Sequence, residues 1–420
     1  MSQATPAASS RPYVTITADT HAGASIEAYR EYLDPKERRE FDDWRGSYSN
    51  PSRRHVGGKK IKNWDSDVRR KDLESDGVVA EVIFPNTVPP FYQKAYHISP
   101  PANPDDYRRK LAGTRAHNRW LAEFCADDSE RRAGIGLIHL NDIDDAIEDV
   151  EWIAKHGLRG GVLLPLPSPS EGHLAPLNDP IYERLWAAIQ DCDLVMNQHS
   201  GQGSPSYADA QGSNALWASE MPFYVQRGFT YLIMGGVFER FPRLRYILTE
   251  SGCSWAPGLL RRLDGLYFQW KAGAIGEIDM SKDPPLKESP SFYARRNIWY
   301  GASFPSPDDI AGRDVVGVDR ILWGNDYPHY EGSYPYSREN MRFAFADVPE
   351  QEVRMMLGEN AAALYGFDLE ALRPKAATLG ITPELVRHPL PIEDIPEDST
   401  CISFLRARAE AAFAAQAKGA

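Results

Sequence analysis

Acidic residues and histidines stand directly after short apolar segments at four places along this chain. Carboxylates and imidazoles are the protein ligands of Zn²⁺, Mn²⁺ and Fe²⁺. Asp19 and His21 lie two positions apart, and side chains with that spacing on a strand share one face. The pattern therefore indicates a metal site, and with it an enzyme. The residues are Asp19, His21, His199, Glu250 and Asp326.

Composition narrows the class of protein. Of the 420 residues, 42 % are apolar and 25 % are charged, which is typical of a soluble globular protein. The net charge of −12 excludes a nucleic-acid surface and argues against an anionic membrane as partner. The four cysteines show no metal-binding spacing, which suits reduced thiols in the cytoplasm. We expect a cytoplasmic protein whose partner is a small-molecule substrate.

The elements that must position these residues are β-rich runs alternating with helical patterns. Runs of this kind, short and apolar throughout, are typical of strands buried on both faces of a parallel sheet. Eight strands alternating with helices predict a (β/α)₈ TIM barrel. A doubly wound open sheet is the alternative, but no glycine-rich dinucleotide fingerprint follows the first strand. The expected strands are 13–18, 78–84, 133–139, 160–164, 193–198, 245–250, 297–301 and 320–324.

Three parts of the chain are expected around these strands. Residues 1–11 are interpreted as a disordered leader, 12–366 as the metal-dependent barrel, and 367–420 as a helical C-terminal extension. The extension is expected to pack on the barrel or on a partner subunit, and a homodimer is the expected assembly. Two long connections, 22–77 and 85–131, are expected to wall the mouth of the active site, although a surface excursion is the alternative.

In a parallel barrel the carboxyl ends of all strands converge on one face. Asp19, His21, His199, Glu250 and Asp326 are therefore expected to be neighbours. Three or four such ligands with one position left for water define a catalytic metal, which lowers the pKa of bound water to about 7.

The other histidines give weaker signals. His139 closes the third predicted strand and is a candidate for lining the pocket, and His329 is a candidate substrate contact. The rest are interpreted as surface or structural residues; they are His55, His97, His117, His156, His173 and His388.

Several motifs in this order resemble the amidohydrolase superfamily. More narrowly, they are similar to its amidohydrolase-related branch, which includes aminocarboxymuconate-semialdehyde decarboxylase and the resorcylate-type decarboxylases. The resemblance covers roughly residues 12–366 and implies a metal-dependent barrel that performs hydrolysis, nonoxidative decarboxylation or hydration. The motifs are Asp19-Thr20-His21, Gln198-His199-Ser200, Leu322 to His329 and Gly358 to Gly366.

Three departures from the family pattern refine this expectation. A carboxylate, Asp19, stands where many members have a first histidine, which favours a single metal ion. Leu164-Pro165 ends the fourth strand, so a carbamylated lysine bridging two ions is not expected. Glu250 replaces the histidine that the decarboxylase relatives carry on the sixth strand.

The function expected from these residues is hydrolysis of a small cyclic or aromatic amide or ester by a metal-activated water. Glu250 would act as the general base, because a charged glutamate would repel an anionic substrate. Nonoxidative decarboxylation of an aromatic or unsaturated carboxylate is the alternative; hydration and a metal-free binding protein are more distant ones.

The residues are assigned as follows. One divalent ion, Zn²⁺ before Mn²⁺ or Fe²⁺, would be held by Asp19, His21, His199 and Asp326. Glu250, Asp326 and His199 would be catalytic. The expected substrate contacts are Asn86, His139, Ser303 and His329, with loop capping as the alternative for Ser303.

Overall fold

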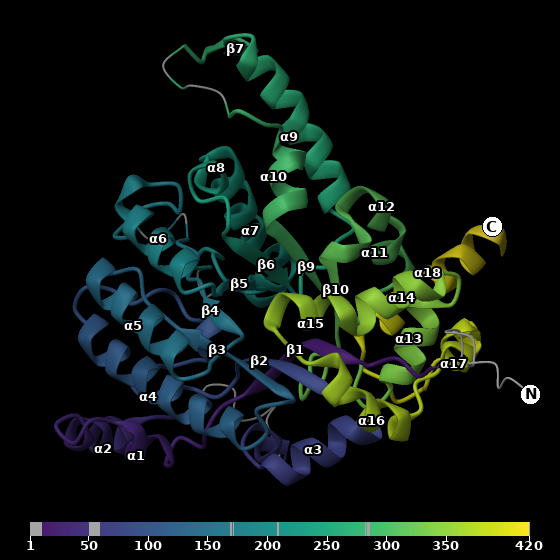
Figure 1. Cartoon of the computed structure of the whole chain (residues 1–420), viewed down its shortest axis with the longest axis horizontal. Coiled ribbons are helices and arrows are strands. Elements are labelled where there is room, and N and C mark those ends of the chain that lie inside the picture. Colours follow the sequence, from purple (N-terminus) through teal and green to yellow (C-terminus); the bar gives the residue numbers. More distant parts are fainter. Residues whose placement is uncertain are drawn as a thin grey trace, which may run out of the picture.

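Eight parallel strands form one sheet, and strands that follow one another along the chain in this sheet pair with each other. The order runs from β1 to β6 and then through β9 to β10. This computed structural model describes residues 11–49, 59–168, 170, 172–207, 210–281, 283 and 286–419. Within them the strands form a nearly closed barrel ringed by helices (Figure 1), which confirms the predicted (β/α)₈ class. The strands are β1 Ile16–Ala22, β2 Ala80–Pro85, β3 Arg132–Leu137, β4 Gly161–Leu163, β5 Val195–His199, β6 Arg245–Thr249, β9 Ile298–Ser303 and β10 Ile321–Gly324.

The first and last strands close the barrel through the segment that follows β10. The amide of Asp326 donates to the carbonyl of Asp19 (2.9 Å), and the amide of His21 donates to the carbonyl of Tyr327 (2.7 Å). Pairing with β2 continues to Ala22, so β1 extends beyond the predicted end at residue 18. Asp19 and His21 therefore lie within the strand rather than after it.

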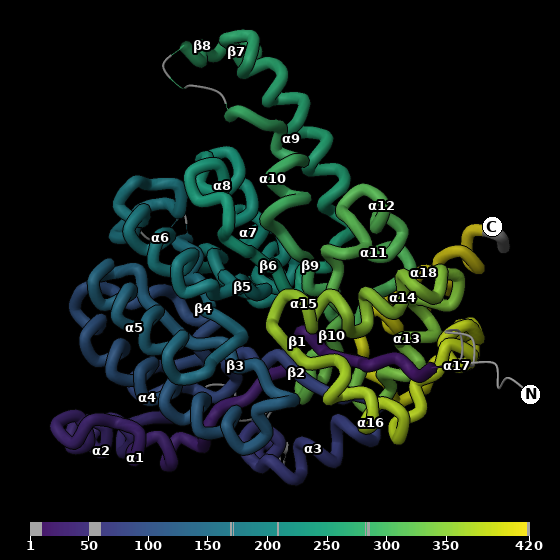
Figure 2. Tube along the Cα trace, viewed as in Figure 1, coloured from purple at the N-terminus to yellow at the C-terminus, as the bar shows by residue number. Residues whose placement is uncertain are grey.

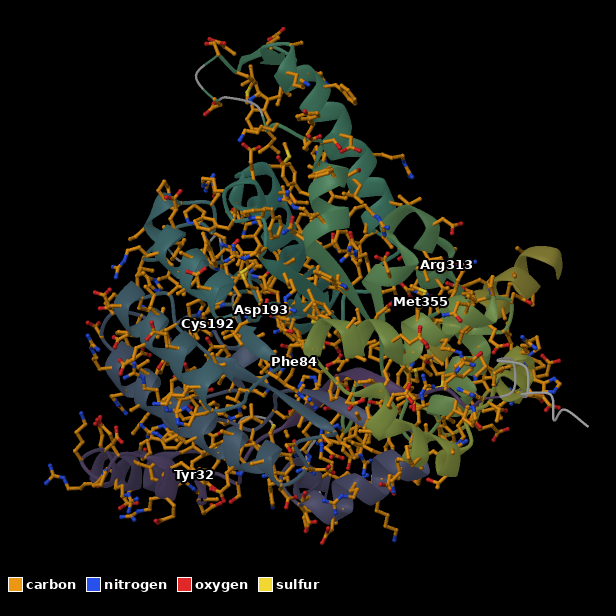
Figure 3. The ribbon with its side chains drawn as sticks, in the orientation of Figure 1. Tyr32, Phe84, Cys192, Asp193, Arg313 and Met355 are labelled. Carbon is orange, nitrogen blue, oxygen red and sulfur yellow. The ribbon has the colours of Figure 1, made fainter. Side chains whose placement is uncertain are left out.

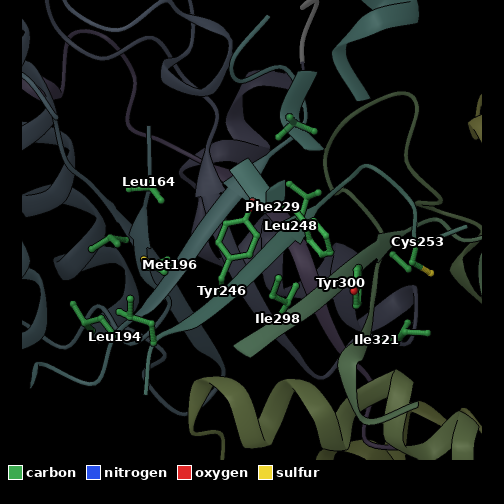
Figure 4. Packing of buried hydrophobic residues seen from close by; sticks show 14 of the residues in the cluster. Leu164, Leu194, Met196, Phe229, Tyr246, Leu248, Cys253, Ile298, Tyr300 and Ile321 are labelled. Carbon is green, nitrogen blue, oxygen red and sulfur yellow. The ribbon is translucent and has the colours of Figure 1, made fainter. Parts of the chain in front are cut away.

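Helices of the barrel wall pack against the outer face of the strands. In Figure 4, Phe229 of α7 lies beside Tyr246 and Leu248 of β6, with Ile298 and Tyr300 of β9 next to them. All five side chains are fully buried. The wall helices are α4 Tyr107–Ala126, α5 Ile143–Lys155, α6 Glu183–Asp191, α7 Ser213–Met234, α8 Val237–Arg240, α10 Pro290–Asn297, α13 Ser337–Phe345 and α15 Asn360–Tyr365.

Local sequence explains why these helices start where they do. The side chain of Asp142 accepts hydrogen bonds from the first amides of α5, as an N-cap does, and Ala146, Val150 and Ile153 form its buried face. Asp179 likewise accepts from the amide of Ile181, where Pro180 opens a 3₁₀ turn that leads into α6.

The long connections carry short helices. Residues 23–79 hold α1 Tyr29–Tyr32, α2 Arg38–Ser47, the 3₁₀ turn Lys59–Asn63 and α3 Ser66–Ser75, and residues 86–106 hold the 3₁₀ turn Tyr96–Ile98. In Figure 3, Tyr32 lies at the periphery while Phe84 of β2 lies near the centre. Residues 50–58 of the first connection lie outside the described residues, as do residues 1–10 of the predicted leader.

An arm projects from the barrel between β6 and β9. It consists of α9 Ala256–Lys271 and the hairpin of β7 Ala274–Ile275 with β8 Ile278–Asp279 (Figure 2). Further short helices lie after β9 and β10, namely α11 Pro307–Ala311, α12 Arg313–Val316 and α14 Glu350–Arg354. Across the part of the chain described, no helix combines the length and apolar character that crossing a membrane requires.

Residues after Gly366 form α16 Leu369–Leu379, α17 Pro383–Arg387 and α18 Ile402–Gly419. Cys401 and Phe404 at the start of α18 are buried in a small cluster with Phe304 and Phe343 of the barrel. The amide of Ile402 donates to the carbonyl of Glu331. This extension therefore touches the loop that follows β10, while its contact with a partner subunit stays a prediction.

A buried ion pair supports the site end of β1. The Arg69 guanidinium is fully buried and donates to both carboxylate oxygens of Glu81 on β2 (2.6–2.9 Å) and to the carbonyl of His21 (2.8 Å). Burial alone would raise the pKa of Glu81, but Arg69 holds it below its usual range. The pair thus ties α3, β1 and β2 together.

We expect Arg69→Met to lower the free energy of unfolding by about 3 kcal/mol, because it leaves the buried Glu81 carboxylate without its main partner. The double variant Arg69→Met/Glu81→Met should recover part of that loss, since no uncompensated charge remains. Urea unfolding followed by tryptophan fluorescence measures both. A double variant no more stable than the single one would contradict this explanation.

Candidate metal centre

Carboxylates and imidazoles from β1, β5 and the segment after β10 meet at the carboxyl ends of the strands. Asp19 Oδ1 lies 3.2 Å from His21 Nε2 and 3.4 Å from His199 Nε2. His21 Nε2 lies 3.2 Å from Asp326 Oδ1. All four side chains are at most 1 % exposed. The convergence predicted for these residues is what the fold produces.

The outer atoms of these residues are fixed by hydrogen bonds. His21 Nδ1 donates to the carbonyl of Pro85 (3.1 Å), and His199 Nδ1 donates to the carbonyl of Ser200 (3.0 Å). With Nδ1 protonated, Nε2 of each ring carries the lone pair that faces the cluster. The hydroxyl of Ser303 donates to Asp19 Oδ2 (2.5 Å), which leaves Oδ1 turned toward both imidazoles.

The inner atoms, in contrast, have no hydrogen-bond partner among the described residues. They are Asp19 Oδ1, His21 Nε2, His199 Nε2 and Asp326 Oδ2. Buried polar atoms without partners are costly, and four of them in one place indicate a bound ion. Ligand atoms of Asp19, His21 and His199 lie within 4.8 Å of one another. Two nitrogen and two oxygen donors suit Zn²⁺, Mn²⁺ or Fe²⁺, so the residues present fit a divalent metal.

Asp326 and Glu250 both have left-handed backbone conformations, with φ of 58°. Such strain at a non-glycine residue persists only where the surroundings hold it. Around Asp326 they do so through Asn325, whose side chain accepts from the hydroxyl of Thr17 (3.0 Å) and donates to Asp76 (3.4 Å). The position of the Asp326 carboxylate therefore depends on contacts remote in sequence.

His329 and Asn86 form a chain that ends on Asp326. His329 Nδ1 donates to Asp326 Oδ1 (2.8 Å), and His329 Nε2 donates to the side-chain oxygen of Asn86 (3.0 Å). Although burial opposes its charge, Asp326 raises the pKa of His329 to about 9. Both expected substrate contacts thus lie beside the cluster, with His329 as a cation paired to a metal-ligand candidate.

Glu250 reaches the cluster from the end of β6. Its Oε2 lies 3.5 Å from His199 Nδ1, and its carboxylate lies within 4.8 Å of those of Asp326 and Glu331. Burial, and then repulsion from Asp326, raise the pKa of Glu250 well above its usual value. It is placed to exchange a proton at the edge of the cluster.

The two other expected substrate contacts lie differently. Ser303 bonds to Asp19, as described, so it positions a ligand candidate. His139 lies apart from the cluster: its Nε2 is 3.3 Å from the hydroxyl of Tyr92, and it lines a neighbouring cavity with Asn141 and Gln202. Burial, and then the charge of Lys110, lower the pKa of His139 to about 4.

Three residues near the cluster were missed by sequence reasoning. His97, interpreted from the sequence as a surface or structural residue, is buried with its ring centroid 5.4 Å from that of His21 and 5.2 Å from that of His199. Phe84 of β2 packs on the His199 ring (4.7 Å), and Glu331 faces Glu250. His97 is in a long irregular connection, so only its place in a loop expected to wall the mouth could have singled it out.

Comparison with known proteins identifies the family. The sequence profile of the amidohydrolase family matches residues 85–367, more than half of the chain. The chain belongs to the amidohydrolase family. This confirms the resemblance inferred from the motifs, and with it that the protein is a member of an enzyme superfamily.

Individual relatives of this family member are decarboxylases. The chain is 24 % identical over 277 residues to gamma-resorcylate decarboxylase of Rhodococcus jostii. The aligned region covers 62 % of this chain and 78 % of that protein. The structure of 5-carboxyvanillate decarboxylase LigW from Sphingomonas paucimobilis superposes with a TM-score of 0.63 at 20 % identity, over 84 % of this chain and 99 % of that one. The structure of dihydroxybenzoic acid decarboxylase from Polaromonas sp., with bound manganese and the inhibitor 2-nitroresorcinol, superposes with a TM-score of 0.60 at 18 % identity. That superposition covers 84 % of this chain and 97 % of the other.

We expect purified protein to bind one Mn²⁺ per chain tightly and His199→Ala to lose that binding, because the variant removes one of the inward-facing nitrogens. His139→Ala is the matched control: it also removes a buried imidazole at a strand end, but one outside the cluster, and should bind Mn²⁺ as the natural protein does. Equilibrium dialysis with elemental analysis measures both. Equal loss in the two variants would mean that unfolding, and not ligand removal, is responsible.

Proposed function

We propose that this protein catalyses the nonoxidative decarboxylation of a small aromatic carboxylate. In that reaction the bond between ring carbon and carboxylate breaks, CO₂ leaves, and the ring carbon takes up a proton. The observation that carries the proposal is the set of four inward-facing, unpartnered ligand atoms in a fold shared with carboxyvanillate and dihydroxybenzoate decarboxylases. The relatives support this alternative over the hydrolysis that the sequence favoured.

One divalent ion would be held by Asp19, His21, His199 and Asp326. When bound, it supplies positive charge that anchors the carboxylate and an adjacent oxygen of the substrate. Manganese is bound in structures of two relatives, which favours Mn²⁺ over the Zn²⁺ that ligand types alone favoured. Ser303 would hold the Asp19 carboxylate in orientation.

Glu250 would supply the proton that the ring carbon takes up. Its carboxyl is beside His199 and Asp326, and its raised pKa favours the protonated form. In that form it does not repel an anionic substrate, which removes the reason for preferring hydrolysis. Asp326 would share the proton transfer, and His199 would orient Glu250.

Asn86 and His329 would contact the substrate next to the ion, while His139 would line the neighbouring cavity. A cytoplasmic homodimer is proposed as the working form. The four free cysteines, three of them buried, support a reducing compartment.

The first test is CO₂ release by the manganese-loaded protein from 2,6-dihydroxybenzoate and 5-carboxyvanillate, with cyclic amides of similar size as the comparison panel. With a carboxylate substrate we expect release of one CO₂ and uptake of one proton per turnover. The His199→Ala variant should release no CO₂. Hydrolysis of a cyclic amide without CO₂ release from any carboxylate would restore the hydrolase interpretation.

A second test addresses Glu250. We expect Glu250→Gln to keep the bound ion and to lose turnover by about 10²-fold or more, because the amide has no proton to transfer. Single-turnover CO₂ release and metal content are measured on the same sample. If the variant loses the ion instead, Glu250 is a ligand and the proton comes from elsewhere.

A further inference from the structure

A third imidazole faces the candidate metal ligands from outside the barrel strands. His97 belongs to the connection between β2 and α4 and is only 7 % exposed. Its ring lies at nearly equal distance from the rings of His21 (5.4 Å) and His199 (5.2 Å). No part of the proposed reaction yet uses this side chain.

His97 has no hydrogen-bond partner on either ring nitrogen among the described residues, and its Nδ1 is fully buried. A buried imidazole nitrogen without a partner is costly. A molecule bound beside the candidate metal ligands would supply the partner that Nδ1 of His97 lacks.

The segment around His97 is held in place. The hydroxyl of Tyr96 donates to the carbonyl of Ile138 after β3, and the amide of Ser99 donates to the carbonyl of Tyr96. The side chain of Ile98 packs on Gly201, which follows β5. A Cβ added to Gly201 would lie only 3.0 Å from Cγ2 of Ile98. The imidazole is thus presented to the cluster by a loop tied to two strand ends.

We propose that His97 is a substrate-positioning residue that donates a hydrogen bond to an oxygen substituent on the ring of the aromatic acid. The inference rests on the proposed function and names a contact within the same site. A neutral imidazole provides one donor and one acceptor, which matches a ring hydroxyl beside the carboxylate.

The role of a donor predicts loss of ligand affinity without loss of the ion. We expect His97→Phe to weaken binding of 2-nitroresorcinol about tenfold, the effect of one lost hydrogen bond, while Mn²⁺ content and melting temperature stay unchanged. His97→Gln, which retains a donor, should restore part of the affinity. Calorimetric titration of the manganese-loaded proteins measures these affinities.

Lys94→Ala is the matched control, because it alters an exposed side chain of the same loop and leaves both the imidazole and the Tyr96 anchor in place; its affinity should change much less than that of His97→Phe. For decarboxylation, His97→Phe should raise KM more than it lowers kcat. Unchanged affinity in His97→Phe would overturn the inference and leave the proposed function standing. Loss of Mn²⁺ from that variant would make His97 a metal ligand and also overturn it. Failure of the natural protein itself to bind 2-nitroresorcinol would overturn the aromatic substrate and this contact with it.

Discussion

Closure of the barrel between β1 and the segment after β10 is the constraint on which the site depends. Two backbone hydrogen bonds, from Asp326 to Asp19 and from His21 to Tyr327, join the two ends of the sheet. Each bond involves a residue whose side chain faces the cluster. The peptide groups that close the barrel therefore also set the spacing of the ligand candidates. The same two hydrogen bonds contribute to the stability of the fold and to the geometry of the metal site.

A second layer of contacts gives these side chains their direction. The carbonyls of Pro85 and Ser200 select the ring tautomers, and Ser303 turns the Asp19 carboxylate. Because the outer Nδ1–H of each histidine donates to a carbonyl, the inward-facing Nε2 becomes more basic toward a cation. Phe84 covers one side of His199 and limits access of water. Protein contacts thus hold each candidate ligand in one orientation, which favours tight binding of an ion.

Electrostatics explains why a glutamate on the sixth strand is compatible with an anionic substrate. From the sequence alone, Glu250 is expected to be an ionised carboxylate. Because such a carboxylate would repel an anionic substrate, the sequence favours hydrolysis. In the fold, the same side chain is withdrawn from solvent and lies beside Asp326 and Glu331, and both its burial and the neighbouring carboxylates raise its pKa. The prediction of hydrolysis was reasonable for an isolated residue, and the decarboxylase relatives favour the other outcome.

The sequence by itself determined the barrel and most of the cluster. Alternation of short apolar strands with amphipathic helices specifies the fold class, and parallel strands bring their carboxyl ends together whatever the details of packing. That logic was enough for Asp19, His21, His199 and Asp326. It could not place His97, Glu331 or the hydrogen bond of Ser303 to Asp19, nor show that His139 lies apart. Those positions depend on loop paths and side-chain rotamers, which tertiary contacts decide because no local periodicity encodes them.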